Sequence, residues 1–485
     1  MRPVILMVVL MLTALVRIRI GYDRPLWFDE VWTGVLAGPT SWLAFLHDCY
    51  LEASPPLYYL VARTSAAIAG ESNAALRLPS VAFALAAPLV ALLPVRLMER
   101  DTRLLWCGLV AAWAPGLWFT HDARPYAMLL FLAMLNTLAF AALLRKTGTR
   151  NAVLWIGSAS LLILTHYFAG FLILAQGCLY LVYGRKQAVR TWPALLVLLP
   201  VLGWMAFHAP RMQQFANPEF AAYHPLRALD VQRCLGFIIG SQFIMWPVLG
   251  LMTALAIASL AAPGVRTRLR TEAEPGLWLT TIATIAGFSL VIVLATFRPI
   301  LVPRYLTPFV PGMLLALALT VRRPGRLQGS STFILIALFL FSLGLWVLAP
   351  ERNESRYNFQ YASDFLMKAK TTRLVFFWDH PTLPIEDRSQ LQRVAGFFFT
   401  RAGKKVEVDP VFVPRGVDPN PMLLQHADAP GSAILWIYDG AVRGTAANTY
   451  PPALSRLNSD WRCEDFGRRR IKIIACTQHG PPKVA

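Results

Sequence analysis

The residues of this chain that could do chemistry are carboxylates, arginines, imidazoles and phenols at the ends of long apolar runs. An adjacent acidic pair, Asp29 and Glu30, follows the first run. The other candidates follow later runs and are Arg77, His121, Asp122, Arg124, Tyr126, His166, Tyr167, Arg304 and Tyr305. A guanidinium group binds phosphate oxygens through two parallel hydrogen bonds, and a carboxylate beside it can take a proton from a hydroxyl or an amine. The set therefore suits group transfer from a phosphate ester.

The composition predicts a membrane protein. Of the 485 residues, 56% are hydrophobic and 15% are charged, whereas soluble chains are roughly 45–50% apolar and about 25% charged. The apolar residues occur in blocks of about 17–22, each long enough to cross roughly 30 Å of hydrocarbon as a helix. The net charge of +19 comes largely from short basic clusters between these blocks. Such clusters indicate orientation signals rather than a surface for nucleic acid.

The apolar blocks predict about eleven membrane-spanning helices. They cover residues 4–20, 78–95, 104–119, 127–144, 153–168, 169–184, 191–209, 243–262, 277–297, 300–320 and 331–349. A twelfth apolar segment, residues 57–69, is short and contains Arg63. A run of that length is more typical of an interfacial or re-entrant helix than of a spanning one.

The basic clusters set the expected orientation. Five loops carry three basic residues each: Arg96, Arg100 and Arg103; Arg145, Lys146 and Arg150; Arg185, Lys186 and Arg190; Arg266, Arg268 and Arg270; and Arg322, Arg323 and Arg326. If residues 57–69 do not span, all five loops share the side of Arg2, which the positive-inside rule assigns to the cytoplasm. We therefore expect a multi-pass protein of the plasma (inner) membrane with a cytoplasmic N-terminus. The candidate residues then share the extracytoplasmic face.

Each candidate also has a purely structural explanation. Asp29 and Glu30 could be a solvated pair at a helix start, and Arg124 could belong to a simple turn. His166 could be a satisfied histidine at a helix boundary, and Arg304 could be an interfacial anchor whose head reaches water. The joint arrangement is harder to explain in this way, because chance gives no reason for all of them to share one face.

The composition changes at Pro350, which divides the chain into a membrane region, 1–350, and a tail, 351–485. Strand-like runs at 374–378, 406–413, 433–438 and 471–476 alternate with helical stretches at 361–370 and 388–401. This alternation predicts a small extracytoplasmic α/β domain. Cys463 and Cys476 could form a disulfide in that compartment, worth roughly 3 kcal/mol in the chain-entropy model, or could be two buried thiols.

Four motifs in order give the chain a family resemblance. They are Trp27-Phe28-Asp29-Glu30, Pro55-Pro56-Leu57-Tyr58, Ala74-Ala75-Leu76-Arg77-Leu78-Pro79-Ser80 and Asp122-Ala123-Arg124-Pro125-Tyr126. As a set, over about residues 1–320, they resemble the GT-C glycosyltransferases (glycosyltransferase family 39-like), which use polyprenyl-phosphate sugars. This superfamily includes protein O-mannosyltransferases and the aminoarabinose transferase of lipid A.

The resemblance implies roles for several residues. Asp29 would be the catalytic carboxylate, with Glu30, Asp122 and Arg124 lining the site, and the first external loop would form short juxtamembrane helices. One departure stands out: lipid A-modifying relatives often carry Glu-Lys directly before the two prolines, where this chain has Ala53 and Ser54. That departure weakens an aminoarabinose assignment and any metal site taken from those relatives.

These observations predict an integral-membrane glycosyltransferase that moves a sugar from a polyprenyl-phosphate carrier to a glycan, lipid or protein acceptor. The alternative is a transporter or flippase of a lipid-linked glycan, although the interiors of the spans are almost free of the charges that transporters use. No cofactor is indicated, and a divalent metal is left open. The expected partners are the lipid-linked sugar, the acceptor and membrane lipids, with no nucleic acid.

Overall fold

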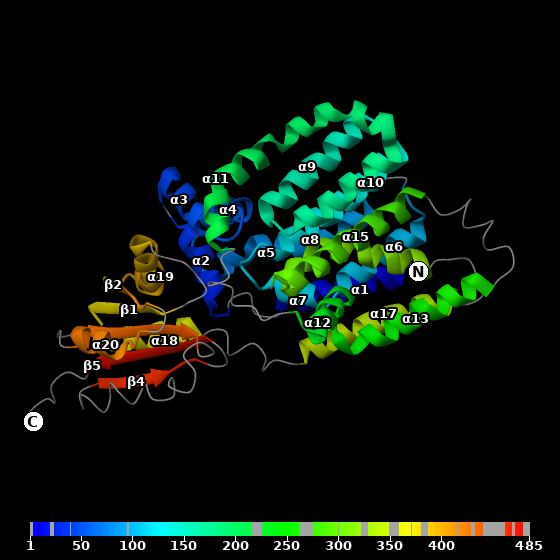
Figure 1. Ribbon diagram of the computed structural model, residues 1–485. Helices are drawn as coiled ribbons and strands as arrows, with labels where there is room; N and C mark the ends of the chain where they lie inside the picture. The colour runs from blue at the N-terminus through cyan, green and yellow to red at the C-terminus, as the bar shows by residue number, and fades with distance from the viewer. Residues whose placement is uncertain are drawn as a thin grey trace, which may run out of the picture.

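A computed structural model places most of the chain in a helical bundle and a smaller C-terminal sheet (Figure 1). The structure describes residues 3–19, 24–38, 40–94, 97–215, 226–261, 275–298, 300–321, 328–348, 358–369, 371–379, 387–414, 417–427, 432–439, 461–467 and 471–478. The predicted basic clusters at 266–270 and 322–326 lie outside the described residues.

The bundle consists mainly of apolar helices. Its α-helices are α1 (Pro3–Arg19), α5 (Asn73–Leu89), α6 (Arg100–Ala112), α7 (Pro115–Thr120), α8 (Tyr126–Arg145), α9 (Thr149–Thr165), α10 (Ala169–Arg190), α11 (Leu199–Phe215), α12 (Ala228–Ile239), α13 (Gln242–Ala261), α15 (Pro275–Phe297), α16 (Val310–Val321) and α17 (Gln328–Val347). Three 3₁₀ turns, η1 (Val90–Leu92), η2 (Trp192–Leu198) and η4 (Pro303–Phe309), extend α5, α11 and α16.

The described residues do not confirm the exact set of eleven predicted spans. Within the described residues, six are long and apolar enough: Asn73–Leu92, Tyr126–Arg145, Trp192–Phe215, Pro275–Phe297, Pro303–Val321 and Gly329–Val347. A seventh would be the pair α12 and α13, which is bent by 78°. The other predicted spans, 4–20, 104–119, 153–168 and 169–184, fall on helices that are shorter, broken or kinked.

The predicted span 104–119 is broken because a proline interrupts it. Pro115 lacks an N–H and its ring would clash with the carbonyl of residue 111 in a continuous helix, so α6 ends at Ala112 and α7 begins at Pro115. The buried Arg17 guanidinium donates to the Ala111 and Gly116 carbonyls at 3.1 and 3.3 Å. It thereby satisfies polar backbone groups near the break, which would otherwise be costly to bury.

The loop after α1 forms three short helices, α2 (Phe28–Ala37), α3 (Trp42–Leu51) and α4 (Leu57–Ala69). The segment that we expected not to span, residues 57–69, is α4, and it has 13 residues. Figure 1 shows these helices at one end of the bundle, between it and the C-terminal sheet. This loop carries Asp29 and Glu30.

The C-terminal part contains one five-stranded sheet in the order β2-β1-β3-β5-β4. Its elements are α18 (Asn358–Lys368), β1 (Arg373–Asp379), α19 (Arg388–Arg401), β2 (Glu407–Phe412), α20 (Asn420–Ala427), β3 (Ser432–Asp439), β4 (Trp461–Asp465) and β5 (Ile471–Gln478). Strands β1, β2 and β3 are parallel, whereas β5 is antiparallel to β3 and β4. All four predicted strands and the helix at 388–401 lie here, and β4 and α20 were not predicted.

The predicted disulfide is confirmed. Cys463 on β4 and Cys476 on β5 are direct partners in the antiparallel register, and their sulfurs are bonded. The bond closes the edge hairpin of the sheet.

The first loop and the C-terminal sheet share one hydrophobic core. Phe28 and Trp32 of α2 pack with Phe359, Trp378 and other buried side chains of the C-terminal part. Burial of aromatic side chains is among the strongest contributions to an interface. The loop that carries the acidic pair is therefore packed between the bundle and the sheet (Figure 1).

Candidate functional site

The acidic pair is split by helical geometry. Asp29 and Glu30 lie in the first turn of α2, and consecutive helical residues point about 100° apart. Glu30 is fully buried, whereas the Asp29 side chain retains 29% exposure. The two carboxylates therefore have different surroundings and different partners.

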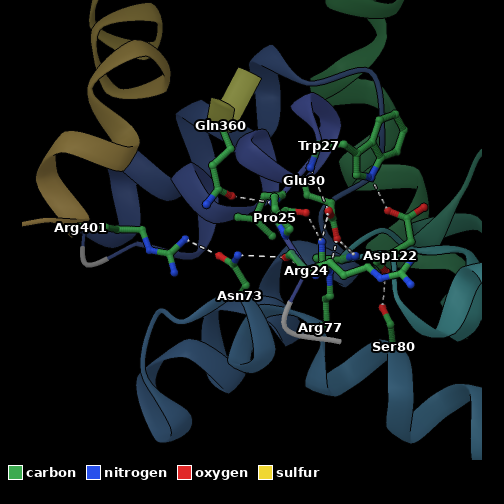
Figure 2. A network of polar contacts seen from close by, with 12 residues as sticks. Arg24, Pro25, Trp27, Glu30, Asn73, Arg77, Ser80, Asp122, Gln360 and Arg401 are labelled. Carbon is green, nitrogen blue, oxygen red and sulfur yellow. Dashed lines mark hydrogen bonds and ion pairs between the residues drawn. The ribbon is translucent and has the colours of Figure 1, made fainter. Parts of the chain in front are cut away.

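Glu30 forms a buried ion pair with Arg77 of α5. Arg77 donates from Nε to Oε1 at 2.7 Å and from Nη2 to Oε2 at 2.5 Å, and both side chains are at most 1% exposed. The same guanidinium donates to the carbonyls of Arg24 and Pro25 at 2.7 and 3.0 Å. Glu30 also accepts the Trp27 backbone N–H at 3.1 Å, the bond that a glutamate makes back to the start of its helix. Figure 2 shows this network.

Two reciprocal hydrogen bonds tie the first loop to the turn before α8. The backbone N–H of Ala123 donates to Glu30 Oε1 at 2.7 Å, and the Trp27 indole N–H donates to Asp122 Oδ1 at 2.9 Å. The Ser80 hydroxyl holds the same turn by donating to the Asp122 carbonyl at 2.7 Å (Figure 2). Three segments far apart in the sequence are thus fixed around the start of α2.

Asp122 has an unusual protonation equilibrium. Its burial, followed by the negative charge of Glu30, raises the pKa of the Asp122 carboxyl to about 7. The Trp27 indole N–H bond and the positive charge of Arg124 act in the opposite direction. Asp122 is therefore a carboxyl that changes charge near neutral pH.

Asp29 faces Arg304, which lies in the turn η4 before α16. Asp29 Oδ2 lies 3.5 Å from Arg304 Nη2, and the arginine side chain is 35% exposed. The Arg304 guanidinium also lies 5.8 Å from the ring centroids of Trp27 and Tyr126. Aromatic faces stabilise a cation at such distances, so Arg304 stays charged beside the carboxylate.

Arg124 contacts the backbone of Asp29 and, through Tyr59, connects to a second carboxylate. Arg124 Nη1 donates to the Asp29 carbonyl at 3.2 Å and to the Tyr59 hydroxyl at 3.3 Å. That hydroxyl donates to Glu52 Oε2 at 3.3 Å. Burial raises the pKa of the Glu52 carboxyl, against the opposing effects of Arg124 and the Tyr59 bond. Glu52 is therefore easier to protonate than a carboxyl in water.

Both arginines have spare hydrogen-bonding capacity. Arg124 Nε and Arg304 Nε are buried and have no hydrogen-bond partner among the described residues. Leaving a buried donor of a charged group unpaired costs about 1–3 kcal/mol or more. Two cations with unpaired donors beside one exposed carboxylate form an electrostatic site that suits an anion.

Aromatic rings complete this site. His166, between α9 and α10, lies 4.7 Å from the Tyr305 ring and 6.2 Å from the Tyr126 ring. His166 Nδ1 accepts the Phe168 backbone N–H at 3.3 Å, so one ring nitrogen supports the local turn. The structure therefore brings Asp29, Asp122, Arg124, Tyr126, His166, Arg304 and Tyr305 into one cluster around Trp27.

Two predicted site residues lie apart from this cluster. The His121 ring lies 2.6 Å from the Arg17 carbonyl and 3.1 Å from the Leu117 carbonyl, so it joins the broken helix to α1. The Tyr167 hydroxyl bonds to His208 and Trp204 of α11 at 2.5 and 2.8 Å. The geometry gives both residues structural partners.

Sequence reasoning missed Trp27, Glu52 and Tyr59 as parts of the site. Trp27 stands inside a quoted motif and Tyr59 directly follows one, yet an aromatic residue there gives no sign of its hydrogen bond. Glu52 ends α3 and precedes the two prolines. The available signal was an acidic residue separated from Pro55 and Pro56 by only Ala53 and Ser54, because a proline pair fixes the direction of the chain.

Among the described residues, no three His, Cys, Asp or Glu side chains lie close enough together to hold a metal ion. The two carboxylates beside Arg124, Asp29 and Glu52, do not by themselves make a metal cage.

The chain was compared with known proteins. No protein-family model matches it, and no curated protein matches it. The fold is similar to that of ArnT from Cupriavidus metallidurans in the apo state, with a TM-score of 0.59, 14% identity and coverage of 97% of each chain. The same protein bound to undecaprenyl phosphate gives a TM-score of 0.57 at 14% identity and the same coverage.

A weaker likeness is to the archaeal oligosaccharyltransferase AglB from Archaeoglobus fulgidus, in complex with an inhibitory peptide and a dolichol-phosphate. Its TM-score is 0.47 at 10% identity, over 89% of this chain and 69% of that one. Over nearly its whole length, the chain has a fold similar to that of ArnT.

Proposed function

We propose that this protein is a membrane glycosyltransferase that takes a sugar from a polyprenyl-phosphate carrier and transfers it to a glycan, lipid or protein acceptor on the extracytoplasmic face. The observation that carries the proposal is the pair Arg124 and Arg304, which both contact Asp29 and whose buried Nε donors have no hydrogen-bond partner among the described residues. ArnT, whose fold the chain shares, has been seen bound to undecaprenyl phosphate.

The charge balance of the site supports a phosphate ligand. Arg124 and Arg304 carry two positive charges, and Asp29 offsets one of them. Glu52 and Asp122 both have raised pKa values, so they add less negative charge than carboxylates in water. A phosphodiester donor carries one negative charge and the departing monoester carries up to two. The net positive charge of the site therefore stabilises the phosphate group more strongly as the bond to the sugar breaks and negative charge builds up on the phosphate.

Asp29 is the carboxylate that we assign as base. In the reaction, the acceptor oxygen forms a bond to the anomeric carbon as the bond from that carbon to the phosphate oxygen breaks. The electron pair leaves with the phosphate, and the acceptor proton passes to Asp29. Its partial exposure gives Asp29 access to an acceptor, and its ion pair with Arg304 holds the carboxylate in place.

Glu30 has a different role in this proposal. Its oxygens already accept bonds from Arg77, Ala123 and Trp27, so we assign it to positioning rather than to proton transfer. Removing one partner of a buried ion pair costs about 3–5 kcal/mol. Glu30→Gln is therefore expected to lower the yield of folded protein, in contrast to Asp29→Asn.

The central test is the Asp29→Asn variant in liposomes that contain a panel of polyprenyl-phosphate hexoses and pentoses. Release of polyprenyl phosphate should fall by about 10²–10⁴-fold, the contribution of a positioned base. Asp230→Asn is the matched control, because Asp230 is an exposed carboxylate on α12 that pairs with Arg233. Transfer by Asp29→Asn at the wild-type rate would exclude this mechanism.

A transport function predicts a different result in the same liposomes. The intact lipid-linked sugar would then move between leaflets without release of polyprenyl phosphate. Mass spectrometry of membrane glycolipids and envelope glycans from a deletion strain would complement the assay, because the missing sugar would identify the donor and the class of acceptor.

A further inference from the structure

The segment that leads into α2 is an irregular stretch held by hydrogen bonds from several elements. Arg77 and Asn73 of α5 donate to the Arg24 carbonyl at 2.7 and 3.0 Å. Arg77 also donates to the Pro25 carbonyl at 3.0 Å. Because Trp27 and Asp29 follow at once, the path of this segment decides where both side chains lie.

One bond in this set comes from the C-terminal domain. The Leu26 backbone N–H donates to Gln360 Oε1 at 2.8 Å. Leu26 is fully buried and Gln360 lies in α18 (Figure 2). A residue 334 positions away in sequence therefore satisfies the backbone directly before the proposed active site.

A second path runs from α19 to the same segment. Arg401 Nη1 donates to Asn73 Oδ1 at 2.9 Å, and Asn73 Nδ2 donates to the Arg24 carbonyl. The Arg401 guanidinium lies 5.2 Å from the Phe397 ring centroid. Figure 2 shows Arg401, Asn73, Arg24 and Arg77 in sequence, ending at Glu30.

Packing fixes the distance between α2 and the C-terminal domain. A Cβ atom built on Gly34 would lie 2.4 Å from the Phe397 ring, so α2 touches α19 without space between them. The Phe28 ring centroid lies 5.1 Å from that of Phe359. The buried Asp48 of α3 is held by two bonds from Arg393, one of them 2.7 Å. A contact this tight transmits displacement, because protein interiors are close-packed.

We propose that the C-terminal domain is part of the catalytic apparatus and that Gln360 and Arg401 are positioning residues for Asp29 and Trp27. The inference rests on the proposed function for the catalytic role of Asp29. The contacts described above show how the C-terminal domain holds the segment before it. The expected effect falls on turnover rather than on donor binding, because Arg124 and Arg304 come from other loops. A misplacement of about 1 Å can cost about 10²-fold in rate.

The test is Gln360→Leu in the full-length protein, assayed for sugar transfer from the polyprenyl-phosphate donor. We expect kcat to fall at least tenfold while the donor KM changes less than threefold. Gln360→Glu keeps an acceptor oxygen for the Leu26 N–H and should recover most of the rate. The matched control is Gln392→Leu, because Gln392 bonds to the Val408 carbonyl within the same domain at 3.1 Å. That variant should keep the wild-type rate.

Hydrogen exchange of the peptide covering residues 24–36 gives a readout that does not depend on activity. Exchange should rise in Gln360→Leu and stay unchanged in Gln392→Leu. If exchange rises but no donor is turned over even by the wild type, the positioning contact stands and the proposed function fails. If Gln360→Leu transfers sugar at the wild-type kcat, or loses only thermal stability, the positioning proposal is overturned.

Discussion

At the scale of residues, the site divides two adjacent carboxylates between two tasks. The order Trp27-Phe28-Asp29-Glu30 drew attention to the pair, and residue chemistry alone gave no reason to choose between its members. The helix separates the two side chains, because it directs Glu30 towards a buried ion pair with Arg77 and leaves Asp29 facing Arg304. A sequence shows which residues are neighbours, but the face that each presents depends on where the helix begins.

The arginines should affect donor binding. Arg124→Lys and Arg304→Lys keep the charge but lose the planar donor fork, so we expect the donor KM to rise by about tenfold or more, as for loss of a charged hydrogen bond. Steady-state kinetics with varied polyprenyl-phosphate sugar would measure this. Arg233→Lys serves as the control, because the exposed Arg233 side chain pairs with Asp230 on α12. An unchanged donor KM in both site variants would make these arginines structural.

Asp122 should make stability depend on pH. Its folded-state pKa is about 7, above the ordinary value of 3.8, so the folded state holds the proton more tightly and loses stability as pH rises towards 7. Asp122→Asn keeps an acceptor for the Trp27 indole and removes the charge. As the pH rises from 5.5 to 8.5, the free energy of unfolding of the variant should increase by about 2 kcal/mol relative to that of the wild type. Thermal unfolding in detergent would check this, and parallel pH profiles for the two proteins would contradict it.

At the scale of elements, hydrophobic runs predict where the helices lie but not where a helix is broken. The run 104–119 is apolar throughout, so hydropathy alone reads it as one span. The break at Pro115 depends on a local clash, and its stability depends on Arg17, almost a hundred residues earlier. The joining of α1, α6 and α7 through one guanidinium is a tertiary contact that no window of sequence contains.

The close approach of α15 and α16 leads to a prediction about packing. A Cβ atom on Gly312 would lie 2.1 Å from Thr284 Oγ1, so Gly312→Ala should force the helices apart and cost about 1–3 kcal/mol. Thermal unfolding of the purified protein would measure the loss. Gly203→Ala is the control, because a Cβ there meets nothing within 4 Å. Equal stability of the two variants would show that the helices are not in this close contact.

At the scale of the whole molecule, the sequence predicted the parts but not their contact. The strands and α19 follow from local pattern, and the tail was read as separate from the membrane region. The interface depends on shape, with Phe397 filling the space that Gly34 leaves free. The Arg393–Asp48 pair adds a charge contact across 345 residues. The types of these residues do not indicate which distant residues they contact.

The orientation remains a prediction that is open to direct test. Reporter fusions after residues 148, 187, 268 and 324 should read cytoplasmic, and a fusion at the C-terminus should read external, as the positive-inside rule requires. Peptide mapping without reductant should recover Cys463 joined to Cys476, which needs an oxidising compartment. A cytoplasmic C-terminus would remove the shared extracytoplasmic face on which the proposed function depends.

The bond between Leu26 and Gln360 has a consequence for the order of events during synthesis. The two residues are 334 positions apart, so at about 5–20 residues per second roughly 20–70 s separate their emergence from the ribosome. During that time the first loop lacks the partner that completes its backbone hydrogen bonds. If the positioning proposal holds, a nascent chain stays inactive until its C-terminal domain has folded, and premature termination after α17 yields a protein without the proposed transferase activity.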